Sequence, residues 1–342
     1  MRSPRLLAIL VFVLSGCATF AGGPDPHTTG PAVDRVPRVA GRDYFESEDW
    51  VVAIARRGDT PRRLAARFLG NARHAWMIED YNETATLRPG QRVVIPKRAW
   101  NVTGVEPSGY QLVPVLVYHD IGPQPKGRML IGVQTFAEQM RYLKTNGYRV
   151  VSLREFYDFI STNRQLPRKA VVLTFDDGYK SFVQYAYPIL KDLGFTATLF
   201  VYTDYVGAGR KALGWDDLIR LAREGFQIEG HSKTHSDLRR RRDESDAEHA
   251  QRVRTEMELP QRLFRQRFGQ ASRFLAYPYG AVDAAVIQGA RDQGYVAAFT
   301  VRREGNGAFV HPFRIRRSQI YAEMSLEDFA KNLNVFSHES LR

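Results

Sequence analysis

Short apolar runs alternate with helix-like amphipathic stretches through most of the chain after residue 113. We expect strands near 114–118, 149–151, 170–175, 196–201, 226–229, 273–277, 296–300 and 314–320. We expect helices between them, at 135–146, 153–162, 181–193, 215–223 and 283–293. Alternating strands and helices form parallel sheets, because each helix returns the chain to the same edge of the sheet. The sequence therefore predicts an α/β fold, a parallel (β/α) barrel, over residues 113–334.

Two adjacent carboxylates end one of these strands, in the sequence TFDDGY at Thr174–Tyr179. Adjacent like charges repel, so the pair is best explained where one carboxylate binds a cation and the other handles a proton. Taken alone, Asp-Asp-Gly is more often a solvated turn. However, His231 and His235 follow another expected strand, and parallel sheets gather strand ends on one face. Two imidazoles and one carboxylate leave a divalent ion with open positions.

A third loop, AYPYG at Ala276–Gly280, follows the expected strand at 273–277. Its proline and glycine fix a turn that could present backbone N–H groups to a developing oxyanion, and its tyrosines could line a sugar site. By itself the loop is an ordinary β-turn. A further apolar strand ends at His119, which on its own reads as a buried structural histidine.

In this order and at these separations, TFDDG, H-x-x-x-H and the Tyr-Pro-Tyr loop resemble the NodB-homology polysaccharide deacetylases, carbohydrate esterase family four. The resemblance covers roughly residues 113–334. It implies a distorted (β/α) barrel with a metal at its C-terminal mouth. It also implies removal of acetyl groups from N- or O-acetylated glycans.

The resemblance assigns roles residue by residue. Asp177, His231 and His235 match the family's metal ligands, and zinc is the expected ion. Asp176 matches the general base, and the backbone of Tyr279 matches the oxyanion donor. A metal held there lowers the pKa of its bound water and polarises the acetyl carbonyl.

Two features depart from most family members. The arginine that steadies the base is missing before Pro278, where this chain has Ala276 and Tyr277, and the late Leu-x-His acid motif is missing after Gly280. Both absences resemble a branch with a rearranged motif order, which includes the poly-β-1,6-N-acetylglucosamine deacetylases. In that branch an early histidine is the acid, so His119 is the expected acid here.

The missing arginine has three candidate replacements in the sequence FRIRRS: Arg314, Arg316 and Arg317. Arg317 aligns best with an arginine common in this branch, although a basic cluster is usually a solvated face. Expected substrate contacts come from Tyr277, Pro278 and Trp215. Trp215 is explained equally well as the start of a helix.

Residues 1–16 resemble a bacterial lipoprotein signal peptide, with arginines, an apolar stretch and the sequence LSGC ending at Cys17. A lipid on Cys17 would anchor an exported protein to the cell envelope. Ala18 after it favours the outer membrane, facing the periplasm, if the organism has two membranes. The alternative is an ordinary secretory signal. Residues 17–45 are rich in Gly, Pro and Thr and predict a flexible tether.

Residues 46–97 form a separate unit with an expected β-α-α-β order. GDT at Gly58–Thr60 and LRPGQ at Leu87–Gln91 resemble a LysM module, and such modules bind N-acetylglucosamine-containing glycans. The alternative is a small packing domain that has lost sugar binding. We expect a polar linker at 98–112 and a loose tail at 335–342.

Net charge and export limit the partners. The chain of 342 residues carries a net charge of +12, which ordinarily favours nucleic acid or membrane surfaces. Export argues against nucleic acid as a partner and leaves anionic envelope polymers and lipid head groups. A single cysteine excludes an internal disulfide.

The sequence therefore predicts a metal-dependent deacetylase that removes N-acetyl groups from an N-acetylglucosamine polymer of the envelope or the extracellular space. The LysM-like unit favours peptidoglycan, and the rearranged motif order favours a poly-N-acetylglucosamine-type polysaccharide. The alternative function is a lipid-anchored glycan-binding protein whose barrel is catalytically inert.

Overall fold

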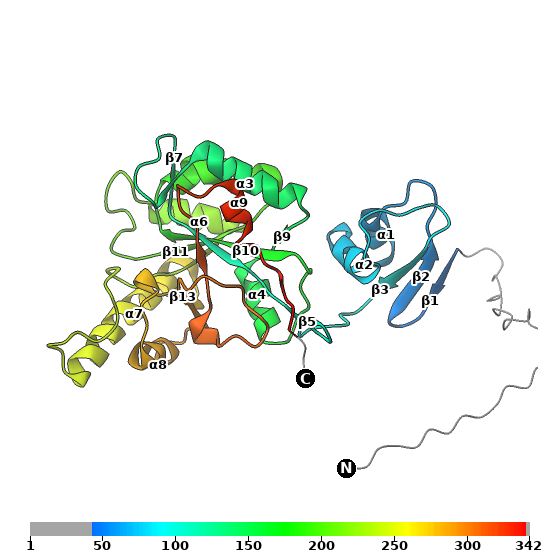
Figure 1. Ribbon diagram of the computed structural model, residues 1–342. Helices are drawn as coiled ribbons and strands as arrows, with labels where there is room; N and C mark the ends of the chain where they lie inside the picture. The colour runs from blue at the N-terminus through cyan, green and yellow to red at the C-terminus, as the bar shows by residue number, and fades with distance from the viewer. Residues whose placement is uncertain (1–42, 340–342) are drawn as a thin grey trace, which may run out of the picture. The chain divides into compact units, whose positions relative to one another are not determined.

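The structure is a computed structural model that describes residues 43–339 (Figure 1). The predicted signal peptide, the lipidation site Cys17 and most of the predicted tether lie outside the described residues. Within residues 43–339, no helix combines the length and the apolar character needed to cross a bilayer.

Residues 44–96 form a small sheet with two helices packed on it. Its elements are β1 (Tyr44–Glu46), β2 (Trp50–Ile54), α1 (Pro61–Phe68), η1 (Ala72–His74), α2 (Ala75–Tyr81) and β3 (Arg92–Pro96). The antiparallel sheet has the order β1-β2-β3. The Thr60 hydroxyl caps α1 by accepting the Arg63 N–H at 3.2 Å. The predicted β-α-α-β order is present, but the predicted tether is too long, because β1 pairs with β2 from Tyr44 onward.

The second group of elements is a parallel sheet surrounded by helices (Figure 1). Its strands are β6 (Val115–Tyr118), β9 (Arg149–Val150), β10 (Ala170–Asp177), β11 (Thr198–Val201), β12 (Gln227–Gly230), β13 (Phe274–Ala276), β14 (Ala297–Phe299) and β15 (Ser318–Gln319). They are ordered β14-β13-β12-β11-β10-β6-β15, and β9 pairs with β10. A bridge from Phe299 to Ile315 brings the segment before β15 beside β14, so the sheet curls back on itself. The predicted (β/α) barrel is confirmed.

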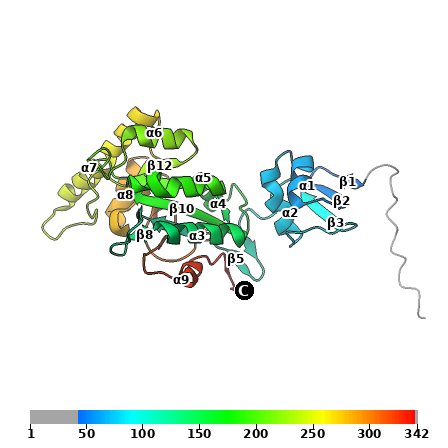
Figure 2. The ribbon, with the colours of Figure 1, turned by 90° about the horizontal axis from the view of Figure 1, so that it is seen from above.

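The connections between these strands carry the helices and two short parallel strands. The helices are α3 (Val133–Thr145), α4 (Leu153–Ile160), η2 (Phe182–Ala186), α5 (Tyr187–Leu193), α6 (Trp215–Arg223), α7 (Asp246–Phe268), η3 (Pro278–Gly280), α8 (Ala284–Asp292), η4 (Pro312–Arg314) and α9 (Leu326–Ala330). The two short strands are β7 (Asp120–Gly122) and β8 (Leu130–Gly132). Figure 2 shows α3 and α5 lying side by side along β10.

Buried apolar side chains lie on both sides of the sheet. Along β10, Val172 belongs to one cluster, with Phe156 of α4 and Phe299, while Leu173 belongs to the cluster that contains Phe136 of α3. Successive residues of a strand point to opposite faces, so β10 is apolar on both. All eight residues of β10 are buried, and the strand therefore holds its carboxylate end in a rigid frame.

The end of the predicted linker pairs with residues 336–337, so these two residues of the predicted tail are not loose. β4 (Val105–Glu106), β5 (Gly109–Gln111) and β16 (Phe336–Ser337) form a three-stranded antiparallel sheet. Gly109 allows β5 to lie close to β16. Its φ is 147°, and a Cβ there would lie 1.9 Å from the Ser337 carbonyl oxygen. Every other residue type would push the two strands apart.

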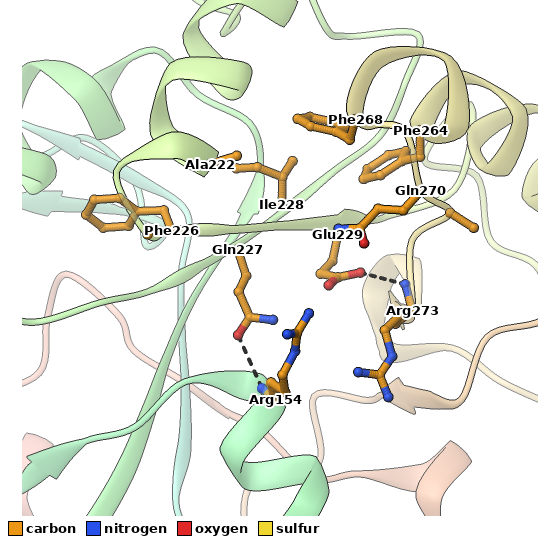
Figure 3. Close-up of a pocket in the computed structure, with 12 residues that line it drawn as sticks. Arg154, Ala222, Phe226, Gln227, Ile228, Glu229, Phe264, Phe268, Gln270 and Arg273 are labelled. Atoms are coloured by element: carbon orange, nitrogen blue, oxygen red, sulfur yellow. Dashed lines mark hydrogen bonds between the residues drawn. The ribbon is translucent and has the colours of Figure 1, made fainter.

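A buried carboxylate joins β12 to β13, which share only one paired position. One oxygen of Glu229 accepts from Ser272 Oγ at 2.7 Å, from the Arg273 N–H at 2.9 Å and from the Phe274 N–H at 3.1 Å. Figure 3 shows Glu229 on one side of β12 and Ile228 on the other, beside a cavity of about 330 Å³. Burial raises the pKa of Glu229 to about 7, although these hydrogen bonds oppose the shift.

Candidate active site

The carboxyl ends of neighbouring parallel strands bring the predicted site residues to one face of the barrel. Asp176 and Asp177 end β10, and the register pairs Asp177 with Val201 of β11 and Val201 with Gly230 of β12. His231 follows Gly230 directly, so the strand register itself places it near the carboxylates. This is the face where parallel α/β barrels carry their sites.

Asp177, His231 and His235 offer ligand atoms that all lie within 4.8 Å of one another. The Nε2 atoms of His231 and His235 are 3.5 Å and 3.3 Å from Oδ1 of Asp177. That Oδ1 is buried and accepts no hydrogen bond. A buried acceptor without a donor implies another partner, and two imidazole nitrogens beside a carboxylate suit a divalent cation. The residues present therefore fit a metal ion.

The orientation of His231 also suits a ligand. Its Nδ1 lies 2.7 Å from the Ala276 carbonyl oxygen, so Nδ1 must carry the proton and Nε2 is free to bind a metal. Burial raises the pKa of Asp177, but contact with His231 outweighs it and brings that pKa down to about 2. Asp177 is therefore ionised at neutral pH, as a ligand must be.

The loop between the two histidines is held by Glu256 of α7, which the sequence did not single out. Oε2 of Glu256 accepts from the N–H groups of Lys233 at 3.1 Å and Thr234 at 2.9 Å, and Oε1 accepts from the Thr234 hydroxyl at 2.6 Å. Glu256 is buried, and Ser232 Oγ accepts the His235 N–H at 3.1 Å. These bonds fix the separation of the two imidazoles along the loop.

Backbone strain is concentrated around these residues. Within residues 43–339, six non-glycine residues have positive φ, and four of them are Asp177 (76°), Ser232 (68°), His235 (61°) and Tyr279 (59°). Each such conformation costs on the order of 1 kcal/mol or more and persists only where the surroundings impose it. The site is therefore held in a geometry that the local chain would not choose.

Asp176 is bound by one of the three candidate arginines, Arg317, which is completely buried. Nη1 and Nη2 of Arg317 donate to Oδ1 and Oδ2 of Asp176, each at 2.7 Å, and Nε donates to the Thr300 carbonyl oxygen at 3.0 Å. Burial raises the pKa of Asp176, but Arg317 and His231 reverse the shift, so the net direction is downward. The other candidates do not contact Asp176: Arg316 pairs with Glu304, and Arg314 is exposed in the lining of a separate groove.

His119 follows β6 and lies near the same carboxylates. Its Nδ1 is buried and has no hydrogen-bond partner. Burial lowers the pKa of His119, and the charges of Asp176 and Asp177 only partly offset that effect. An unpaired imidazole nitrogen at this position is available to exchange a proton with a bound molecule.

Two of the three predicted substrate contacts are buried in the protein, and the third packs between helices. Tyr277 is completely buried, and its hydroxyl donates to the Phe313 carbonyl oxygen at 3.2 Å, so the prediction that it lines the site is wrong. Pro278 is also buried and starts η3. Trp215 begins α6, and its ring packs edge-on against Phe264 of α7 at 6.3 Å, which are the surroundings of a residue in helix packing.

One exposed tyrosine and three half-buried tyrosines lie around His235 instead. The Tyr279 ring is 65 % exposed and lies 4.7 Å from the His235 ring. The Tyr202 ring lies 5.1 Å from His235 and stacks on Tyr205, with centroids 5.1 Å apart, and Tyr179 meets Tyr205 edge-on. Tyr202 and Tyr205 were missed from sequence, and their place just after β11 was the only signal.

Comparison with known proteins agrees with this geometry. The family model described as polysaccharide deacetylase matches residues 163–298. That span includes the paired carboxylates, both site histidines and the Tyr279 loop, and it excludes His119 and Arg317. His119 and Arg317 lie outside the matched residues, and the closure of the sheet brings both of them to the site.

Individual relatives support the same family. YxkH of Bacillus subtilis (strain 168), named as a polysaccharide deacetylase, is 29% identical over 188 residues, 55% of this chain and 64% of YxkH. The poly-β-1,6-N-acetyl-D-glucosamine N-deacetylase of Staphylococcus epidermidis is 23% identical over 212 residues, 60% of this chain and 73% of that enzyme. This chain thus spans less than two thirds of the length of YxkH.

A solved structure shares the fold over the same region. The Streptococcus pyogenes deacetylase PplD, in complex with acetate, superposes with a TM-score of 0.59 at 25% identity, over 66% of this chain and 99% of PplD. The motifs, the curled barrel and these relatives lead to one assignment. Residues 163–298 match the polysaccharide deacetylase family model, and the chain resembles the poly-β-1,6-N-acetylglucosamine N-deacetylases.

Proposed function

We propose that this protein is a metal-dependent hydrolase that removes N-acetyl groups from an N-acetylglucosamine polymer. The observation that carries the proposal is the convergence of Asp177, His231 and His235 within 4.8 Å, beside Asp176. A divalent ion held by these residues, with zinc expected, supplies Lewis-acid polarisation of the acetyl carbonyl and a more acidic water. The relatives named as N-deacetylases support the choice of an amide bond.

The remaining steps belong to side chains and backbone of this chain. Asp176, ionised and aligned by Arg317, takes a proton from the attacking water. The Tyr279 N–H donates to the oxyanion that develops on the acetyl carbonyl. His119 delivers a proton to the leaving nitrogen, and the C–N bond breaks to give acetate and a free amine on the sugar. Burial lowers the pKa of His119, which makes its protonated imidazole a stronger acid.

We also propose where the protein acts. The sequence before Cys17 supports export, and a lipid on Cys17 would hold the domain at the envelope, in the outer membrane facing the periplasm where there are two membranes. The small domain at 44–96, with its LysM-like sequence, would bind the glycan or target the enzyme to it. The polymer is peptidoglycan or a poly-N-acetylglucosamine-type polysaccharide.

Acetate release tests the proposal. Purified full-length protein is incubated with peptidoglycan and with poly-N-acetylglucosamine, before and after chelation, and Zn²⁺ is then restored. We expect release that chelation abolishes and metal restores, and an Asp177→Asn variant that releases none. Binding of either polymer without acetate release by the Zn²⁺-loaded protein would instead establish the alternative, a lipid-anchored glycan-binding protein with an inert barrel.

A further inference from the structure

A groove of about 840 Å³ lies beside the candidate active site. Gly280, the residue after Tyr279, lines it together with Thr300, whose carbonyl oxygen accepts from Arg317. Tyr110 of β5 and Phe309 line it elsewhere. The groove therefore extends from the loop that contains Tyr279 to Tyr110 and Phe309.

The charge of the groove is strongly positive. Two carboxylates, Glu304 and Glu339, face four arginines in its lining: Arg302, Arg303, Arg314 and Arg316. Lys331 also lines the groove, but it is paired with Asp328 at 2.9 Å and with Glu327 at 3.3 Å. Glu304 is shared, at 2.9 Å from Arg316 Nη1 and 3.7 Å from Arg302 Nε. One carboxylate between two guanidinium groups leaves a net positive charge at that point.

Two of the arginines lack acidic partners. Among residues 43–339, no carboxylate lies within ion-pair distance of Arg314, which is exposed. Arg303 binds neutral oxygens, the Gln319 carbonyl at 2.6 Å and the Asn332 side-chain amide. Guanidinium groups with uncompensated charge in a concave surface recognise carboxylates, because their paired N–H groups match the two oxygens.

The same groove offers an apolar surface. Phe309 is 66 % exposed, and its ring meets the Tyr110 ring edge-on, with centroids 4.8 Å apart. Exposed aromatic rings held by a neighbour provide a rigid face on which the apolar side of a sugar ring can pack. Cations and an aromatic face together suit a glycan that carries negative groups.

We propose that this groove binds a carboxylate-bearing stretch of an N-acetylhexosamine polymer, so that the preferred substrate is an anionic glycan. Hydrolysis of an amide bond in this glycan rests on the proposed function. Binding of the glycan in the groove does not. The positive charge of the groove also favours substrate binding over product binding. Deacetylation creates an ammonium group on the glycan, and the arginines repel it. Acetylated, acidic strands are attracted and the more cationic product is released.

The test replaces two groove arginines in the full-length protein. R302Q/R314Q is compared with R254Q/R262Q, which removes the same charge from exposed positions on α7. Substrates are carboxylate-bearing peptidoglycan strands and neutral poly-N-acetylglucosamine. We expect R302Q/R314Q to raise KM for peptidoglycan about threefold to tenfold with kcat unchanged, and to weaken its dependence on salt. KM for the neutral polymer should stay unchanged, and R254Q/R262Q should alter neither.

Three results would overturn the inference: an unchanged KM for peptidoglycan, an equal change with both polymers, or the same change in R254Q/R262Q. If the parent protein releases acetate from neither polymer, the proposed function fails while the groove can still be tested. Binding of peptidoglycan strands and their methyl esters is then measured with the metal-free protein. Weaker binding of the esters, and of strands to R302Q/R314Q, supports the groove, and equal binding excludes it.

Discussion

Replacing Glu256 by alanine should weaken metal binding, although Glu256 is not itself one of the proposed ligands. The substitution removes three hydrogen bonds from Lys233 and Thr234, which lie between His231 and His235. We expect the dissociation constant for Zn²⁺ to rise about 10-fold to 100-fold, the range typical of residues that orient metal ligands.

The size of the effect follows from the contacts. Hydrogen bonds to a charged acceptor contribute about 1.5–3 kcal/mol each, and partial exposure of the loop lets water replace some of that contribution. We therefore expect a loss of about 2–4 kcal/mol in loop stability. Ser232 and His235 both have positive φ in this loop, at a cost of about 1–3 kcal/mol each. The loss is comparable with that strain, so the ligand-ready conformation should no longer predominate.

The assay is a Zn²⁺ competition titration against a chromophoric chelator, followed by acetate release at saturating metal. Saturating Zn²⁺ should restore most of kcat, and Glu256→Gln should recover part of the affinity. Glu258→Ala is the matched control, because Glu258 is exposed on the same helix. A Glu256→Ala protein with lower thermal stability but parental Zn²⁺ affinity would show that Glu256 does not orient the metal ligands and has a packing role only.

Two further predictions concern buried charges. Arg317→Met leaves the Asp176 carboxylate buried without its partner and should lower the free energy of unfolding by about 3–5 kcal/mol in urea titrations. The double variant with Asp176→Asn should recover most of it, and a single-variant loss below about 1 kcal/mol would contradict the pairing. Because burial raises the pKa of Glu229 from 4.5 to about 7, the folded protein binds more protons than the unfolded chain between these values, so stability should fall as pH rises through that window. The fall is on the order of 3 kcal/mol, and Glu229→Gln, studied in chelator, should abolish it; an unchanged slope would exclude Glu229 as the cause.

The sequence predicted the barrel and the positions of its metal-ligand candidates because both depend on local patterns. Asp177 and His231 each follow an apolar strand directly, and parallel strands bring such ends together. Arg317 was singled out from its basic cluster by the family resemblance, and the closure of the sheet beside β6 brings it onto Asp176.

The features that the sequence analysis predicted wrongly or missed share a different cause. Each of them depends on contacts between distant parts of the chain. Tyr277 resembled a sugar contact by composition, but its side chain packs in the cluster that contains Met257 and Val286. The tail was expected to be loose because two paired residues leave no periodic pattern, and their partner strand lies far back in the sequence. Glu256 was hidden in a helix dense with charges of both signs.

The pairing of β16 with β5 makes the two ends of the barrel domain immediate neighbours. A short peptide could therefore join Ser337 to Tyr110 and new termini could be opened in the exposed loop around Arg241, giving a circularly permuted enzyme. Such a permutant would contain the barrel without the residues before Tyr110. Its new termini near Arg241 could then be fused to another protein.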